Sequence, residues 1–192
     1  MIRIFDFATS LLILFISSPF LFIIAMAIKL SSKGPVFYLD KRVGKNKVVF
    51  SMFKFRSMRL NDHNEDNWFT SANDSRITKI GLFIRSTSID EMPQLINVIK
   101  GDMSLVGPRP ESPFAQKIYS TSYWDKVHSI KPGITGLSQI MGRSSLSLDE
   151  KIKYDMEYVN KVKVLSVVKK TAYNIAILFK TIMVVLRRNN SN

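Results

Sequence analysis

The sequence predicts a mostly helical α+β protein that is attached to a membrane near its N-terminus. Three observations predict this fold class: an uncharged apolar run over residues 7–28, two β-rich segments at 36–39 and 48–56, and a second apolar run at 172–186. We expect residues 1–30 to form a re-entrant membrane segment with a helix–break–helix shape. Residues 31–192 should then form a small cytosolic domain with a short β-hairpin and amphipathic interfacial helices.

Composition limits the kinds of site and partner. A chain of 192 residues suits one domain with an appendage and is long enough to bury a core. Because it has no cysteine, disulfides, thiolate metal sites and a cysteine nucleophile are excluded, and its two histidines do not supply a multi-histidine zinc site. The net charge of +13 indicates an anionic partner: nucleic acid, anionic lipid or a phosphorylated substrate.

The N-terminal apolar run is long enough to cross a bilayer, at about 33 Å as a helix. Its centre reads Ser17-Ser18-Pro19. Proline removes a backbone donor there, and serine hydroxyls can bond the freed carbonyls, so Ser18 and Pro19 predict a break in the helix. Positive charge flanks the run on both sides, which is typical of a segment that enters and leaves from the cytoplasmic face. A simple kinked span is the alternative, and the flanking charges favour the re-entrant form.

The C-terminal apolar run at 172–186 is short for a membrane span. Lysines precede it and Arg187-Arg188 follow it. This pattern predicts a helix at the membrane interface, with Lys180 reaching the headgroups. A buried core helix with basic ends fits the pattern equally well.

The segments at 36–39 and 48–56 predict a strand pair around a turn near Gly44-Lys45-Asn46. Strand alternation places Lys54 and Arg56 on the same face. Two cations on one face can hold phosphate oxygens, although an ordinary solvated face explains them too. A polar, Asn/Asp-rich stretch at 59–81 then predicts a loop, with a short helix at 78–85.

Asp90 and Glu91 form an acid pair ahead of Pro93 in this basic chain. Ser88 and Glu91 fit a capping box. Alternatively the helix begins at Pro93 and ends at Gly101. Either way the acids lie at a helix N-terminus, which keeps carboxylates ionised and can bind phosphate. They either cap the helix or carry out chemistry on an anion.

Two further stretches have the composition of ligand-binding loops. Arg109 stands between two prolines, which hold its backbone extended and suit a guanidinium that recognises phosphate. The glycine-rich stretch at 131–143 is turn-rich and contains Thr135 and Gln139, which we expect to line a nucleotide or sugar site.

Taken together, these segments resemble the bacterial sugar transferases, which are monotopic phosphoglycosyl transferases. The resemblance runs over nearly the whole chain, in order: the apolar N-terminal segment with its Ser-Pro pair, then KRVG, FKFRSM, RSTSIDEMPQLINVIKGDMSLVGPRPE, KPGITGLSQI and YDMEYV. The length is similar to that of the minimal members, such as the bacillosamine-phosphate transferases.

The resemblance implies a two-step transfer of a sugar 1-phosphate from a UDP-sugar to polyprenol (undecaprenyl) phosphate, with release of UMP. Asp90 matches the family's nucleophile, which forms a phosphosugar–aspartyl intermediate, and Glu91 matches the second acid. Both acids are expected to bind Mg²⁺. The residues expected to bind substrate phosphate are Arg109, Lys54, Arg56 and Arg42.

The resemblance also implies a place in the cell and in a pathway. It predicts a monotopic enzyme on the cytoplasmic face of the bacterial plasma membrane, in contact with anionic phospholipid and not with nucleic acid. Its reaction would be the first membrane step in assembling a glycan, with downstream glycosyltransferases as further partners. One position departs from the family pattern, because Asn174 stands where an acid is usual.

Two other function classes compete with this one. A membrane-tethered nucleic-acid-binding protein would explain the positive charge, although the chain carries no recognised DNA- or RNA-binding motif. A phosphatase working through aspartyl phosphate would release inorganic phosphate and need no lipid. The sequence does not select the sugar, the glycan or the oligomeric state.

Overall fold

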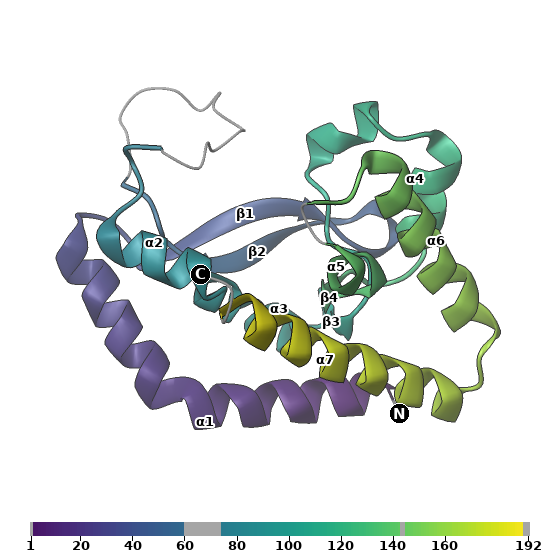
Figure 1. Ribbon diagram of the computed structural model, residues 1–192, viewed down its shortest axis with the longest axis horizontal. Helices are drawn as coiled ribbons and strands as arrows, with labels where there is room; N and C mark the ends of the chain where they lie inside the picture. Colours follow the sequence, from purple (N-terminus) through teal and green to yellow (C-terminus); the bar gives the residue numbers. More distant parts are fainter. Residues whose placement is uncertain (1, 60–73, 143–144, 190–192) are drawn as a thin grey trace.

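A computed structural model describes residues 2–59, 74–142 and 145–189 and has the predicted mostly helical α+β fold (Figure 1). Most of the polar stretch predicted as a loop, residues 60–73, lies outside this description. The elements in chain order are α1 Ile2–Ser31, β1 Phe37–Val43, the 3₁₀ turn η1 Lys45–Lys47, β2 Val49–Phe55, α2 Lys79–Ser86, η2 Ile89–Glu91, α3 Gln94–Lys100, β3 Ser104–Val106, η3 Pro113–Lys117, α4 Thr121–Val127, β4 Gly133–Thr135, α5 Leu137–Met141, α6 Leu148–Val164 and α7 Val167–Asn189.

Helix α1 is continuous but bent into two arms (Figure 1). Pro19 lies inside it and has no N–H to offer the carbonyl of Phe15, four residues earlier. The hydroxyl of Ser18 donates to that carbonyl at 2.8 Å instead. The break expected at Ser18 and Pro19 therefore takes the form of a bend within one helix. Among the described residues, α1 is the one helix long and apolar enough to cross a membrane, and its re-entrant topology stays a prediction.

The two arms of α1 pack on different parts of the domain. Phe5 and Leu14 of the first arm pack against the main core cluster, while Ile24 and Ile28 of the second arm pack on Phe55 of β2. Much of the remaining helix surface is apolar and exposed, including Ile4, Leu11, Leu12, Phe15, Ile16, Phe22, Ile23 and Leu30. The helix thus fastens to the domain along one side and presents apolar side chains on the other.

The predicted hairpin is confirmed. Strands β1 and β2 pair antiparallel, with Tyr38 opposite Lys54 and Asp40 opposite Met52. The turn between them contains two left-handed residues, Asn46 at φ 57° and Lys47 at φ 63°.

A second sheet, absent from the predicted fold, pairs β3 with β4 in parallel. The backbone N–H of Gly107 donates to the Thr135 carbonyl at 2.8 Å. A Cβ on Gly133 would lie 2.0 Å from the Gly107 nitrogen, so glycine is required where the two chains meet. The prediction of a loop at 131–143 is therefore corrected. The described residues of this stretch form the strand β4 and the short helix α5.

The segment around the acid pair decides between the two predicted helix starts. Ser88 is left-handed, at φ 59°, and its side chain makes no cap, so the capping-box interpretation is wrong. Helix α3 has Pro93 as its N-cap and ends at Gly101, at φ 95°, as the alternative predicted. Upstream, α2 starts where the Thr78 side chain accepts from the Gly81 N–H, close to the predicted boundary.

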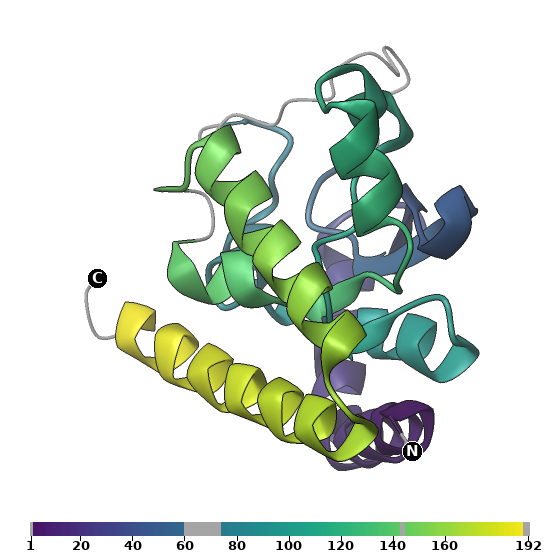
Figure 2. The ribbon, with the colours of Figure 1, turned by 90° about the vertical axis from the view of Figure 1, so that its right-hand side faces the viewer.

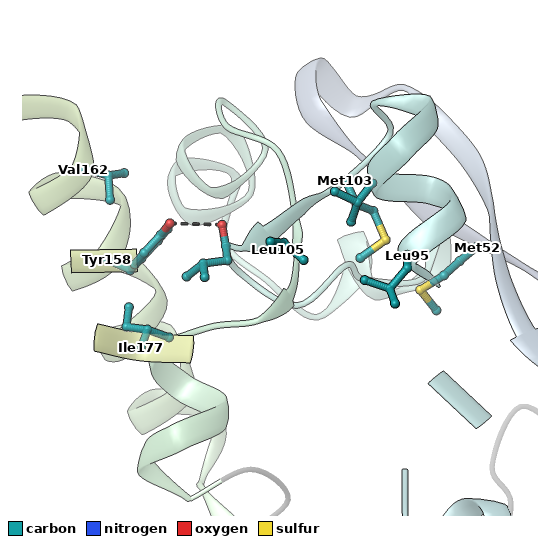
Figure 3. Packing of buried hydrophobic residues seen from close by; sticks show 9 residues of the cluster. Met52, Leu95, Met103, Leu105, Tyr158, Val162 and Ile177 are labelled. Carbon is teal, nitrogen blue, oxygen red and sulfur yellow. Dashed lines mark hydrogen bonds between the residues drawn. The ribbon is translucent and has the colours of Figure 1, made fainter. Parts of the chain in front are cut away.

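The main core joins β3 to α3, α6 and α7. Figure 3 shows the Tyr158 side chain of α6 directed at β3, where its hydroxyl donates to the Val106 carbonyl at 3.1 Å. The same hydroxyl lies 3.0 Å from Oδ1 of Asn174. The buried members of this cluster are Met52, Leu95, Val98, Met103, Leu105, Val106, Tyr158, Val162 and Ile177.

Helix α7 is longer than the predicted apolar run at 172–186, and its two faces differ in burial. Asn174 and Ile177 are buried, whereas Ile175, Phe179 and Ile182 are exposed. It therefore combines the buried core helix and the apolar surface helix that the sequence left open. Figure 2 shows α1 and α7 together along the lower side of the molecule.

Candidate active site

Asp90 and Glu91 lie in the turn η2, directly between α2 and α3. Burial and, after it, the adjacent charge of Glu91 raise the pKa of the Asp90 carboxyl to about 6, although Lys54 and Arg85 act in the opposite direction. Like charges placed side by side disfavour ionisation of both. The structure therefore holds a carboxyl group whose ionised form is destabilised, and such perturbed pKa values are frequent among reactive groups.

Arg109 meets this acid pair from the proline-flanked loop. Its Nη2 donates to Oε1 of Glu91 at 2.8 Å, and the Glu91 carboxylate raises the pKa of the guanidinium. The Arg109 side chain keeps 40% of its surface exposed. The loop itself is fixed because the Gly133 N–H donates to the Pro108 carbonyl at 2.9 Å.

Lys54 and Arg42 approach from the hairpin and share the acid Asp40. Arg42 bonds Oδ2 of Asp40 at 2.7 Å, and Lys54 Nζ lies 3.6 Å from the same oxygen. Arg42 also donates to the Pro110 carbonyl at 3.3 Å, which joins the hairpin to the Arg109 loop. Burial and the Arg109 charge lower the pKa of Lys54. Asp40 was not predicted as a site residue. Strand alternation nevertheless places it on the same face of the hairpin as Lys54, in the diagonal position on the neighbouring strand.

Arg56 does not join this group. It is buried, and its guanidinium donates to the carbonyls of Lys33 and Ser32, each at 2.8 Å, beyond the C-terminus of α1. Arg56 follows Phe55, the last residue of β2, so strand alternation no longer fixes the direction of its side chain. Its hydrogen bonds to the distant carbonyls of Ser32 and Lys33 fix that direction instead. We therefore place Arg56 outside the site, as a residue that ties α1 to the hairpin.

Thr135 and Gln139 are also engaged within the fold. The Thr135 hydroxyl is buried and shares a 2.8 Å hydrogen bond with Thr181 of α7. Nε2 of Gln139 donates to the Ile134 carbonyl at 2.9 Å. The structure brings neither residue to the acid pair through a contact of its side chain, and both support the β4–α5 segment.

A polar network behind Arg109 was not foreseen as part of the site. Glu111, two residues after Arg109, accepts from the Lys151 ammonium and, at 3.0 Å, from the Tyr119 hydroxyl. Lys151 Nζ also lies 3.7 Å from Asp155, a buried acid in the YDMEYV motif. This network fastens the Arg109 loop to α6. The sequence signal for this network was the YDMEYV motif, because no partner had been assigned to its acid Asp155.

The assembled groups suit a phosphorylated ligand. Two adjacent carboxylates face Arg109 and Lys54, with Arg85 close enough to act on the charge of Asp90. Within the described ranges, no three Asp, Glu, His or Cys side chains converge as a metal cage. A pair of carboxylates is nevertheless what Mg²⁺ commonly uses when substrate phosphates and water complete its shell. Asp90 and Glu91 fit that donor set.

Comparisons with known proteins agree with this geometry. The profile of a family described as "Bacterial sugar transferase" matches residues 1–188. The chain is 40% identical over 205 residues to the undecaprenyl-phosphate galactose phosphotransferase of Salmonella typhimurium, covering 98% of this chain and 41% of that protein. It is also 40% identical over 164 residues to the UDP-glucose:undecaprenyl-phosphate glucose-1-phosphate transferase of Klebsiella pneumoniae, covering 82% of this chain and 35% of that protein.

A third relative carries a different sugar in its name. The chain is 36% identical over 178 residues to the UDP-N-acetylgalactosamine-undecaprenyl-phosphate N-acetylgalactosaminephosphotransferase of Aeromonas hydrophila, covering 88% of this chain and 40% of that protein. The chain thus spans about two fifths of the length of these curated relatives.

Proposed function

This chain belongs to the bacterial sugar transferase family, and we propose that it transfers a sugar 1-phosphate from a UDP-sugar to undecaprenyl phosphate, releasing UMP. The observation that carries the proposal is the site geometry: a carboxyl group with a raised pKa beside a second acid that is ion-paired to Arg109. The names of the relatives support the acceptor, because each contains undecaprenyl phosphate.

In the first step, an Asp90 carboxylate oxygen attacks the phosphorus that bears the sugar. A bond forms between that oxygen and phosphorus, and the bond from phosphorus to the bridging oxygen of the diphosphate breaks. UMP leaves with the bridging oxygen, and the sugar phosphate stays on Asp90 as an acyl phosphate. Splitting a difficult transfer through a covalent intermediate gives two easier steps.

In the second step, a phosphate oxygen of undecaprenyl phosphate attacks the same phosphorus. The bond between phosphorus and Asp90 breaks, which restores the carboxylate and yields undecaprenyl-diphosphate-sugar. This would be the first membrane step in the assembly of a glycan. The apolar surface of α1 favours an acceptor that is itself held in the membrane, because it brings the domain to the level of the lipid phosphate.

Both steps bring an anion to an anion, so charge neutralisation is the main task of the site. Arg109 and Lys54 are positioned to contact phosphate oxygens, and Arg42 supports them through Asp40 and the Pro110 carbonyl. We expect Asp90 and Glu91 to hold Mg²⁺, which would neutralise further charge on the diphosphate. Glu91, paired to Arg109, would keep that guanidinium oriented toward the reacting phosphate.

The direct test is a UMP-release assay with Mg²⁺ and undecaprenyl phosphate, run with UDP-glucose, UDP-galactose and UDP-N-acetylgalactosamine. We expect UMP from at least one donor with the wild type, a severe loss with Asp90→Asn and Glu91→Gln, and wild-type rates with Asp149→Asn, an exposed acid on α6. Without acceptor, UMP release should stop at about one equivalent per enzyme, because the aspartyl intermediate then accumulates.

Three outcomes would contradict the proposal. No UMP from any donor would remove the transfer itself. Unchanged activity in Asp90→Asn would remove the aspartyl step. Release of inorganic phosphate without lipid would identify a phosphatase. Retention of radiolabelled sugar phosphate on the wild type, and not on Asp90→Asn, would separate the two-step route from direct transfer.

A further inference from the structure

A cavity with several cationic side chains in its lining lies apart from the acid pair. Its volume is about 260 Å³, and it is lined by residues of the first turns of α1, the turn η1, the strand β3, the segment just before β4, α6 and α7. None of the residues that line it is Asp90, Glu91, Arg109, Lys54 or Arg42. Because six separate segments line it, the cavity is built by the tertiary fold and not by a single loop.

Four cationic side chains line this cavity: Arg3, Lys45, Lys131 and Lys170. Arg3 donates to the carbonyls of Val98 and Ile99 at the end of α3. By contrast, the ammonium groups of Lys131 and Lys170 have no hydrogen-bond or ion-pair partner among the described residues. Burial and the nearby charge of Arg3 lower the pKa of Lys131, and the charge of Lys45 acts in the same direction.

The acids near the cavity do not balance these charges. Asp6 is buried in its wall, and its Oδ2 accepts from the Ser104 hydroxyl at 2.6 Å. The charge of Asp102 also acts on Lys131, but this carboxylate lies outside the lining and faces Lys100 at 3.9 Å. Four cations against one engaged carboxylate in the lining leave a net positive cavity, and an anion placed there would relieve the repulsion between the lysines.

The cavity lies beside apolar surface on both helices that flank it. Ile4, next to Arg3 on α1, is 71% exposed, and Val168, close to Lys170 on α7, is 70% exposed. Cationic groups set next to apolar side chains match the boundary between lipid headgroups and acyl chains. A phosphate entering from that boundary would meet Lys170 and Lys131.

We propose that this cavity is an accessory binding site for a phosphate group, supplied either by an anionic phospholipid headgroup or by free phosphate. Its size supports a small ligand, because about 260 Å³ is below the roughly 300–1,000 Å³ of sites for drug-sized molecules. A nucleotide-sugar therefore fits it poorly, and the site is separate from the donor site of the proposed reaction. Occupancy would fasten the start of α1 to α7.

The test compares two double variants of the full chain in detergent. Lys131→Gln/Lys170→Gln removes the two unpaired ammonium groups, and Lys163→Gln/Lys169→Gln removes the same charge from exposed positions on α6 and α7. Thermal unfolding is measured in sodium phosphate against sodium chloride at equal ionic strength. Native mass spectrometry then counts phosphatidylglycerol retained from mixed phosphatidylglycerol–phosphatidylcholine nanodiscs.

We expect phosphate, phosphatidylglycerol or both to bind the wild type and the Lys163→Gln/Lys169→Gln control. Binding by Lys131→Gln/Lys170→Gln should be at least about tenfold weaker, a loss of about 1.4 kcal/mol, because charge-assisted hydrogen bonds are lost. An effect of inorganic phosphate alone would identify free phosphate as the source, and an effect of the lipid alone would identify the headgroup.

Further variants keep the proposal falsifiable. Lys131→Arg/Lys170→Arg keeps both charges and should keep binding, which separates charge from folding. The response should also persist in Arg109→Gln, where phosphate binding at the acid pair is weakened. The proposal is overturned if neither ligand affects the wild type, if both double-glutamine variants lose the response equally, or if Arg109→Gln alone abolishes it.

Discussion

Replacing Asp90 by asparagine should make the folded protein more stable at pH 7 and leave its stability near pH 4 almost unchanged. The pKa of Asp90 is about 6 in the folded protein, against an ordinary value of 3.8. The folded state therefore binds this proton more tightly than the unfolded state does. As pH rises through the interval between these values, the unfolded chain ionises first, so the wild type loses stability.

The magnitude follows from the difference between the two pKa values. At about 1.4 kcal/mol per pKa unit, a shift of roughly two units costs the wild type about 3 kcal/mol above pH 6. Because Asp90 is only partly buried, water screening reduces this figure, and we expect a gain of about 1–3 kcal/mol for Asp90→Asn. Well below pH 3.8 the carboxyl is neutral in both states, so asparagine gives no such gain.

The measurement is the free energy of unfolding in detergent between pH 4 and pH 7.5, for wild type, Asp90→Asn and Asp149→Asn. The difference between Asp90→Asn and wild type should rise from near zero and level off above pH 6. Asp149→Asn, which makes the same substitution at an exposed acid in the first turn of α6, is the matched control. A flat or falling difference for Asp90→Asn would refute the reasoning.

Three further predictions concern other parts of the molecule. Gly133→Ala should lower the free energy of unfolding by more than about 3 kcal/mol, because the new Cβ would lie 2.0 Å from the Gly107 nitrogen; near-native stability in a denaturant titration would contradict this. Lys151→Met should cost about 1–3 kcal/mol by leaving Glu111 without its ammonium partner, and adding Glu111→Gln should restore part of the loss; an additive double variant would exclude the coupling. The chain has no cysteine, so single cysteines at the two ends of α1 should react with an impermeant reagent from the same side of the membrane, and labelling from opposite sides would show a simple span.

Local chemistry allowed much of the fold to be predicted. The hairpin followed from β-rich segments around a glycine–asparagine turn, and the bounds of α3 followed from Pro93 and Gly101. The hydroxyl of Ser18 bonds the Phe15 carbonyl, as expected for a serine beside an internal proline. Each of these features is decided by residues a few positions apart, which a single sequence contains in full.

What the sequence did not reveal depends on contacts across long separations. Ser88 satisfied the local rule for a cap, but tertiary packing places it in a left-handed turn. Arg56 finds its partners more than twenty positions earlier, at backbone carbonyls that no local sequence pattern marks. Strands β3 and β4 have three residues each, too few for a periodic signal, and their pairing depends on glycines that allow two backbones to touch.

The attachments of α1 have a mechanical consequence. Its first turn is held by Arg3, whose guanidinium caps the end of α3, and the chain just beyond its last turn is held by Arg56, which extends from the end of β2. Helix α3 follows the acid pair, and β2 carries Lys54. Both ends of the bent helix are therefore tied by hydrogen bonds to elements that position site residues. Sliding the helix against that frame would break several charge-assisted hydrogen bonds, at about 1.5–3 kcal/mol each. With α1 in the membrane, as the sequence predicts, we expect the depth of this helix to set the height of Asp90 above the lipid.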